Sequence, residues 1–346
     1  MIIGICGYGF TGTGAVFSLL KEYSRIRCLP GKRDDIEFTI SYMPDGLEDL
    51  EYHLCRNFVK GISSDTAIYR FQLLVRDLER SHNRFTQNRF KRLSYDYLDS
   101  LIQVRWQGIR TFEYDRNRAA LIRYSRLLRS YLSTRLKRCG FNAALFPFHE
   151  RYLSVEPKDF QHKTKQYMAK LLGPIPPGEA LLLNQPFSTN NPQHSMRFFE
   201  DPRCIIVDRD PRDLYIMAKY VYGPSAMFIP TDSVENFITY FVNVRKSLQT
   251  HDSRILPVRF EDLVFCYEET VSSIEDFLGL SPDQHQNRKR HFQPEDSIQN
   301  TNIFGKYAQE EAAIKKIEQE LAEWLYPFQK SAGSGDGKNL ARFTFM

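Results

Sequence analysis

The chain has 346 residues, of which 42% are hydrophobic and 26% are charged, and its formal net charge is +5. This balance is typical of a globular protein with one large α/β domain or two smaller ones. No apolar stretch reaches the roughly 20 residues of a membrane helix, and the apolar start is too short for a signal peptide, so we expect a soluble, cytoplasmic protein. The six cysteines are scattered without a C-x-x-C pair, which predicts buried free thiols and no metal site.

The first predicted elements are a strand over the apolar run that begins at Ile2 and a helix at about Gly14 to Arg25, separated by a glycine-rich turn. A turn of this kind points backbone N–H groups at an anion, and the N-terminus of the helix adds a favourable dipole. The sequence therefore predicts an anion-binding loop at the end of the first strand.

Three classes of nucleotide compete for this loop. Glycines at positions 7, 9 and 12 match the G-x-G-x-x-G pattern of dinucleotide-binding proteins. A nucleoside triphosphate loop would need Gly-Lys-Ser/Thr, and Thr13-Gly14-Ala15 stands there instead, so ATP-type phosphotransfer is disfavoured. A nucleotide with a 5'-phosphosulfate fits Thr11-Gly12-Thr13, because a Ser/Thr-Gly-Thr loop can hold the phosphate without a metal.

Between this loop and the later strands, the sequence predicts a strand at Ile36 to Tyr42 and then an insertion at about residues 52–175. Helical spacing of leucine and aromatic residues predicts several helices from about Thr66 to Lys137. From Arg70 to Cys139, seventeen Lys or Arg stand against six Asp or Glu, a net charge of +11. This charge favours an anionic partner or forms solvated helix faces, and no nucleic-acid-binding motif accompanies it.

Three apolar runs in the second half end in polar residues, which is typical of buried parallel strands whose C-terminal ends present a site. These runs are Glu179 to Phe187, Arg203 to Asp210 and Arg254 to Leu263. With the helices between them they predict an α/β fold, a central and mainly parallel sheet flanked by helices, in one domain over residues 1–330. The Gly/Ser-rich residues 331–346 are expected to form a flexible tail.

The second of these strands is followed by the segment RDPRD at residues 209–213. Pro211 would rigidify the corner between strand and helix, and Arg209 could hold a phosphate through two hydrogen bonds. Alternatively, Arg209, Arg212 and Asp213 form a structural cluster of ion pairs.

The order of the motifs resembles that of the sulfotransferases that use 3'-phosphoadenosine 5'-phosphosulfate (PAPS), above all their bacterial members. The shared features are the loop, RDPRD after a strand, and RFEDL followed by IEDFLGL. The resemblance implies a P-loop NTPase-like fold and metal-independent transfer of a sulfuryl group from PAPS to a hydroxyl of a saccharide or similar acceptor. It places the cofactor on the loop and on three basic residues, namely Gly9, Phe10, Thr11, Gly12, Thr13, Gly14, Arg209, Arg212 and Lys306.

Three positions depart from the family pattern. Phe10 stands where the family has Lys or Arg, so positive charge for the leaving phosphate must come from loop N–H groups and from Arg212 or an arginine of the insertion. Met217 replaces a serine that binds the 3'-phosphate, and FGKY offers only Lys306 for a late basic segment. A non-catalytic nucleotide-binding relative therefore remains an alternative.

Acids and histidines are the candidates for the general base that deprotonates the acceptor hydroxyl. The carbohydrate-type members of the family carry a glutamate after the second strand, where this chain has Asp45, Glu48 and Glu51. These acids could also form the first turn of an ordinary helix. His149 and His194 are the other candidates.

A dinucleotide-dependent oxidoreductase or epimerase is the main alternative function. It would need an acid near the end of the second strand to hold a ribose. Asp45 lies farther along the chain than this role expects, and Asp34 and Asp35 precede the strand.

Overall fold

The computed structural model describes residues 1–30, 35–57, 60–108, 128, 131–132, 134–135, 149–226, 228–248 and 252–328. Its centre is a five-stranded sheet in the order β2-β5-β1-β6-β7, and all neighbouring strands are parallel. The strands are β1 (Ile2–Gly7), β2 (Ile26–Cys28), β5 (Ala180–Asn184), β6 (Pro202–Asp208) and β7 (Ile255–Arg259). The predicted fold class, a mainly parallel sheet flanked by helices, is confirmed.

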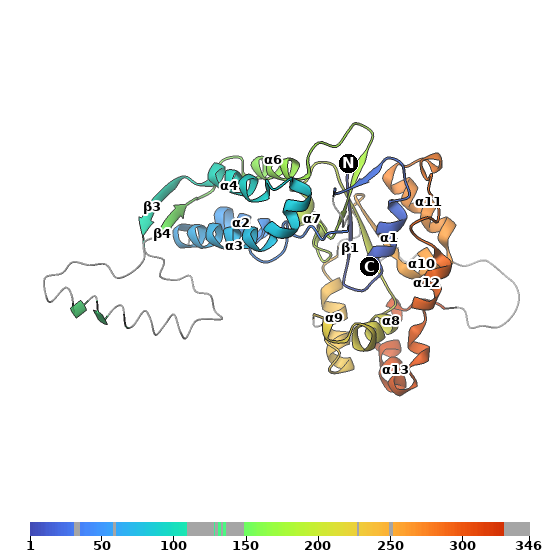
Figure 1. The fold of residues 1–346 in the computed structure, drawn as a ribbon. Helices are drawn as coiled ribbons and strands as arrows, with labels where there is room; N and C mark the ends of the chain where they lie inside the picture. Colours follow the sequence, from blue (N-terminus) through green and yellow to red (C-terminus); the bar gives the residue numbers. More distant parts are fainter. Residues whose placement is uncertain are drawn as a thin grey trace, which may run out of the picture.

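Helices cover both faces of this sheet because its strands are apolar on both faces (Figure 1). On β1, Ile3 and Ile5 pack with helix α1 (Thr13–Leu20) and with the helices that follow β7. Ile2 and Cys6, which point to the opposite face, join the core of the inserted helices. Gly7 ends β1 between these two layers, where the glycine-rich loop begins.

The segment between β2 and β5 forms a helical arm on one side of the sheet (Figure 1). Its elements are α2 (Leu47–Glu51), a π-helical turn (Tyr52–Arg56), α3 (Lys60–Thr86), α4 (Phe90–Leu101), β3 (Val104–Gly108), β4 (His149–Leu153) and α6 (Phe160–Leu172). The buried side chains of Phe71, Phe90 and Leu98 hold α3 and α4 together. The antiparallel hairpin of β3 and β4 stands at the far end of the arm.

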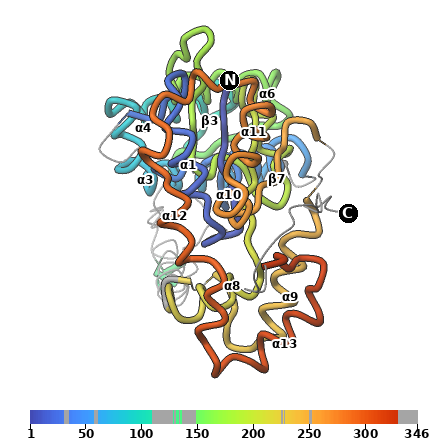
Figure 2. The backbone as a smooth tube through the Cα atoms, turned by 90° about the vertical axis from the view of Figure 1, so that its right-hand side faces the viewer, coloured from blue at the N-terminus to red at the C-terminus, as the bar shows by residue number. Residues whose placement is uncertain are grey.

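The remaining elements come after β5, β6 and β7, and the helices that follow β6 lie beyond the C-terminal ends of the strands (Figure 2). They are α7 (Pro192–Met196), α8 (Pro211–Ile216), a π-helical turn (Met217–Val221), α9 (Val234–Arg245), α10 (Phe260–Phe265), α11 (Tyr267–Leu278), α12 (Pro294–Ser297) and α13 (Glu311–Glu320). Short 3-10 turns lie at Gly223–Ala226, Pro282–Gln284, Ile298–Asn300, Ile303–Lys306, Ala308–Glu310 and Ala322–Trp324. In the part of the chain that the structure describes, no helix is long and apolar enough to cross a membrane.

Two predicted strands need correction. The prediction of a strand at Ile36 to Tyr42 is wrong, because only Glu37 forms an isolated bridge, with Asn184. The edge of β5 is already paired with β2 from Ala180 onward, and the chain turns at Thr39, whose carbonyl accepts from the Met43 amide. The strand predicted to run to Leu263 ends at Arg259, where α10 begins.

The helical prediction for the arm is correct as far as Leu101 and wrong at β3, which is a strand. Most of the rest of that prediction, including Cys139, lies outside the described residues, as does the predicted tail at residues 331–346. The other five cysteines are free thiols, and two of them, Cys6 and Cys204, are buried.

Candidate functional site

The loop between β1 and α1 has the left-handed backbone conformation at three residues. The φ angles are 88° at Gly9, 55° at Phe10 and 94° at Gly12. A Cβ on Gly9 would lie 2.3 Å from the Phe228 ring, and one on Gly12 would lie 2.5 Å from the Phe260 ring. Glycine is therefore required at both positions, on conformational and on steric grounds.

This loop presents donors that the protein itself does not use. Among the described residues, the N–H groups of Gly9, Phe10, Thr11 and Gly12 have no hydrogen-bond partner, and the buried Thr11 hydroxyl has none either. The first turn of α1 contains no acidic residue and no side-chain cap. Such a set of free donors at a helix N-terminus suits an anion such as a phosphate.

On its β5 flank the loop is held by the segment that follows that strand. Gly7 donates its N–H to Gln185 Oε1 at 3.3 Å, and its carbonyl accepts from the Thr189 hydroxyl at 3.0 Å. The neighbouring amide of Ser188 donates to Ser195 Oγ on α7 at 3.0 Å. Ser195 in turn lies beside Glu48, so a short chain of contacts joins this carboxyl group to the loop.

Glu48 is one of three acids at this end of the sheet whose carboxyl pKa is strongly raised; the others are Asp213 and Glu261, which lie on the far side of the loop, after β6 and β7. Burial raises the pKa of Glu48 to about 7, against the opposing effects of Arg197 and Ser195. Its Oε1 atom is buried without a hydrogen-bond partner among the described residues. Arg197 forms its ion pair with Glu51 instead. A carboxyl group of this kind can exchange a proton near neutral pH.

The other predicted bases have different surroundings. Asp45 is partly exposed: its Oδ1 lies 3.8 Å from the Arg70 guanidinium, and its amide donates to Asp49 Oδ2 at 2.7 Å, next to the start of α2. His194 is exposed on α7, one residue before Ser195. His149 is exposed at the start of β4 in the hairpin of the arm. The structure thus brings Glu48 and α7 to the loop, and it leaves His149 on the arm.

On the β6 flank, Arg209 is buried, with 3% of its surface exposed. Its guanidinium contacts the Phe10 carbonyl at 3.5 Å, the Asn300 carbonyl and the Asp213 carboxylate at 3.7 Å. Its Nε atom has no partner among the described residues. Arg209 therefore touches the loop directly and keeps one donor free. Burial raises the pKa of Asp213 to about 6, and Arg209 opposes this shift.

Arg212 and Lys306, the other two predicted basic residues, have their contacts outside the loop. Arg212 donates to Asp210 at 2.7 Å and to Glu318 at 2.8 Å, and its guanidinium lies 4.3 Å from the Phe304 ring centre. Lys306 is exposed at the end of a 3-10 turn whose first amides donate to Asp213. The Arg212 guanidinium is thus held by acids of its own chain.

Two features near the loop have no counterpart in the sequence analysis. Asp208, the last residue of β6, forms a buried two-contact ion pair with Arg245, at 2.8 Å and 2.7 Å, and Arg245 lies 4.0 Å from the Tyr8 ring centre. Phe10 stacks on Tyr222 with ring centres 3.8 Å apart and on Phe228 at 5.3 Å. No local signal predicts either feature, because the partners are tens to hundreds of residues apart.

Comparison with known proteins assigns the chain to a family. A family model described as "Sulfotransferase family" matches residues 3–284. The chain therefore belongs to the sulfotransferase family, whose P-loop-like fold agrees with the sheet and loop described above. A comparison with curated proteins finds no match.

Solved structures with a related chain path include sulfotransferases and retinol dehydratase. The sulfotransferase domain from the curacin biosynthetic pathway is 13% identical, with a TM-score of 0.36 over 82% of this chain and 76% of that chain. A sulfotransferase from Mycobacterium avium is 14% identical, with a TM-score of 0.33 over 84% and 66%. Retinol dehydratase in complex with androsterone and inactive cofactor PAP is 11% identical, with a TM-score of 0.35 over 95% and 82%.

Proposed function

We propose that the protein transfers a sulfuryl group from PAPS to an acceptor hydroxyl, that of a saccharide or a similar molecule, with Glu48 as the general base. The observation that carries this proposal is the Glu48 carboxyl group, which has a pKa of about 7 and is joined to the anion-binding loop through Ser195, Ser188 and Thr189. Family membership supports the reaction class. The proposed base is a glutamate and not a histidine, as in the carbohydrate-type members of the family, and this favours a saccharide acceptor.

The proposed donor site is the loop and its β6 flank. PAPS, when bound, supplies a sulfuryl group on a phosphate leaving group. Gly9 to Gly12 fit such a group because their amides and the Thr11 hydroxyl lack partners among the described residues. In this proposal Thr13 and Gly14 extend the cradle as the first residues of α1, where the helix dipole favours negative charge. Arg209 would hold the 3'-phosphate by exchanging its backbone contact at Asn300 for that anion.

The proposed role of Glu48 follows from its environment. A base must be deprotonated at the working pH and must gain from accepting a proton, and a pKa near 7 satisfies both conditions. Burial supplies that pKa, and Oε1 makes no hydrogen bond among the described residues, so we propose it as the proton acceptor once binding of the acceptor has moved the side chains that cover it. Arg197 stays with Glu51, so it does not hold Glu48 in the ionised state as a close ion pair would.

Phe10 changes how the loop would stabilise the leaving phosphate. The family's cation is replaced by a ring that stacks on Tyr222, and Arg212 is held by Asp210 and Glu318. We propose that the loop amides and Arg209, whose guanidinium contacts the Phe10 carbonyl, supply the positive charge. No group of acids, histidines or cysteines in the described ranges could hold a metal ion, and the proposal requires none.

The test is a sulfuryl-transfer assay of the purified full chain with PAPS and a panel of saccharide acceptors, in EDTA. We expect formation of PAP and sulfated saccharide. PAP is also expected to raise the melting temperature, whereas NADH and ATP leave it unchanged. Stabilisation by NADH alone would support the dinucleotide alternative, and stabilisation by PAP without transfer to any acceptor would support a non-catalytic relative.

A further inference from the structure

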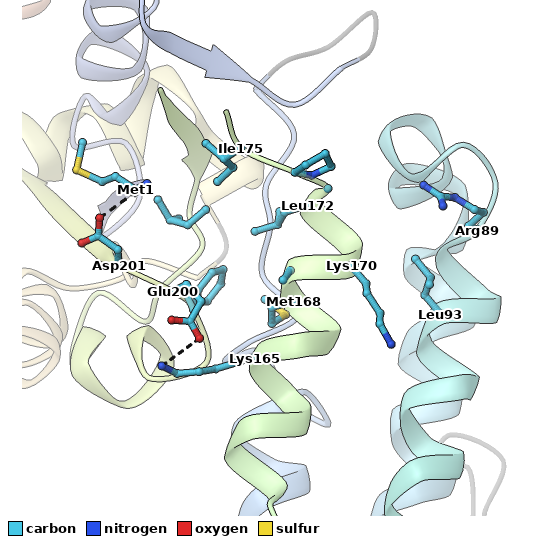
Figure 3. Close-up of a pocket in the computed structure, with 15 residues that line it drawn as sticks. Met1, Arg89, Leu93, Lys165, Met168, Lys170, Leu172, Ile175, Glu200 and Asp201 are labelled. Atoms are coloured by element: carbon cyan, nitrogen blue, oxygen red, sulfur yellow. Dashed lines mark ion pairs between the residues drawn. The ribbon is translucent and has the colours of Figure 1, made fainter. Parts of the chain in front are cut away.

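A cavity of about 640 Å³ lies at the opposite end of the sheet from the anion-binding loop. It is bounded by α4 and α6 of the arm, by the start of β1 and by residues 199–201 before β6 (Figure 3). Ile2 at the cavity and Gly7 at the loop are five positions apart on β1, about 16 Å along the strand. The cavity is therefore a separate site from the one assigned to sulfuryl transfer.

The inner lining of this cavity is apolar. Its apolar side chains come from both the arm and the sheet: Ile2, Leu93, Met168, Leu172, Ile175 and Phe199. Leu172 and Ile175 are only partly buried, so they keep apolar surface in contact with water. A concave apolar site of this size lies within the range of small-molecule sites, and covering its walls would be favourable.

The rim of the cavity carries an excess of positive charge. Two of its cations are neutralised: Lys165 pairs with Glu200 at 3.4 Å, and the Met1 amine lies 3.8 Å from Asp201. Arg89 and Lys170 also line the cavity, and neither has an acidic partner among the described residues (Figure 3). Within the described part of the chain, the Arg89 side chain donates to the Thr86 carbonyl alone, at 3.2 Å.

We propose that this cavity binds an amphipathic anion, an apolar chain that ends in a carboxylate or phosphate. The apolar walls would cover the chain, and Arg89 and Lys170 would meet the head group at the rim. A cationic amphiphile would place its charge against those two side chains, and a neutral one would leave them unused. The inference does not depend on the proposed sulfuryl transfer, because it uses no residue of the loop or of its flanks.

The experiment is a calorimetric titration of the full chain with dodecanoate, dodecyltrimethylammonium and dodecanol, each below its aggregation concentration. We expect dodecanoate to bind most tightly, with dodecanol weaker and the cation weakest. Saturating PAP should not displace dodecanoate, because the two sites lie at opposite ends of β1. Equal binding of all three probes, or no binding of dodecanoate, would overturn the proposal.

Substitutions then locate the binding site. The double variant R89E/K170E should weaken dodecanoate binding about tenfold or more, because two attractive charges become repulsive. The control R84E/K158E changes the net charge equally at two exposed residues outside the cavity, and its affinity should match the unsubstituted chain. Ala169→Trp, at an exposed residue of the lining, should block the cavity without lowering the melting temperature. An equal loss in the control, or full binding by Ala169→Trp, would place the ligand elsewhere.

Discussion

The two flanks of the glycine-rich loop differ in how their charged groups are paired. On the β6 flank the three acids of residues 208–213 each have a cation: Asp208 pairs with Arg245, Asp210 with Arg212 and Asp213 with Arg209. On the β5 flank Glu48 has a raised pKa and a buried oxygen without a partner among the described residues. Paired charges fix the backbone around the loop, and an unpaired buried carboxyl group is available for proton transfer.

The largest expected effect comes from removing the unpaired carboxyl group. Glu48→Gln keeps the size of the side chain and cannot accept the proton, so we expect kcat for sulfuryl transfer to fall about a hundred- to ten-thousandfold. Affinity for PAP, measured by calorimetry, should stay unchanged. Asp45→Asn is the matched control, because Asp45 faces the exposed Arg70 and should lose less than about threefold. Equal losses in both variants would assign Glu48 no special role.

The pH dependence of sulfuryl transfer is a second test of the role of Glu48. Because burial raises the pKa of Glu48 to about 7, the limiting acid limb of kcat/KM should have its midpoint near pH 7 and rise toward alkaline pH. The contribution of Glu48 to folding stability changes with pH in the opposite direction. A raised carboxyl pKa contributes stability below its unfolded value of 4.5, and this contribution is lost as the pH rises through about 7.

Glu48→Gln should therefore melt higher than the unsubstituted chain at pH 8 and equally at pH 4. A variant that loses activity because it misfolds would melt lower at both values, so differential scanning calorimetry separates the two explanations.

Breaking an ion pair on the β6 flank should lower the free energy of unfolding. Arg245→Met leaves Asp208 buried without its cation, which is expected to cost about 3–5 kcal/mol of unfolding free energy in urea denaturation. Arg254→Met breaks a similar ion pair with Asp252, but at a more exposed arginine, and should cost less than about 1 kcal/mol. If both substitutions cost the same, the Asp208 pair contributes nothing special to the β6 flank.

Arg209 tests whether the paired flank also binds ligand. Arg209→Ala should weaken binding of PAP by about 1.5–3 kcal/mol, roughly ten- to a hundredfold, because a charge-assisted contact to the 3'-phosphate is lost. Adenosine 5'-phosphosulfate lacks that phosphate and should bind almost as before. The control is Arg212→Ala, which removes a guanidinium that Asp210 and Glu318 hold. It should lower the melting temperature and change the affinities for PAP and for adenosine 5'-phosphosulfate equally. Equal losses for the two ligands in Arg209→Ala would make Arg209 a purely structural residue.

The sequence predicted those parts of the fold whose signal is local. Strands β1, β5 and β6 are buried on both faces, so they appear as continuous apolar runs between turns. β2 has only three residues, and β3 has an exposed pattern, so neither carries such a signal. The stretch at Ile36 to Tyr42 alternates like a strand because Phe38 and Ile40 are buried, although the backbone there turns instead of pairing.

The candidate site likewise has features with a local sequence signal and features without one. Glycine spacing predicted the loop, because left-handed backbone restricts the residue type at single positions. The sequence gives no means to rank Asp45, Glu48 and Glu51, because their burial depends on α7, which is about 150 residues farther along the chain. The partners of Arg212 at Glu318 and of Arg209 at Asn300 are likewise distant, so a motif alone does not separate ligand contacts from ion pairs.

The smallest expected effect distinguishes two glycines of the loop. Gly12→Ala should destabilise the fold by about 1–3 kcal/mol, because φ is 94° there and the new methyl group would lie 2.5 Å from the Phe260 ring. The clash is with the protein itself, so the melting temperature should fall without any ligand. Gly14→Ala meets no atom within 4 Å and lies inside α1, so it should stabilise the chain by up to about 1 kcal/mol. Thermal denaturation of the two variants gives the comparison, and a Gly12→Ala variant as stable as Gly14→Ala would mean that Phe260 does not pack against the loop.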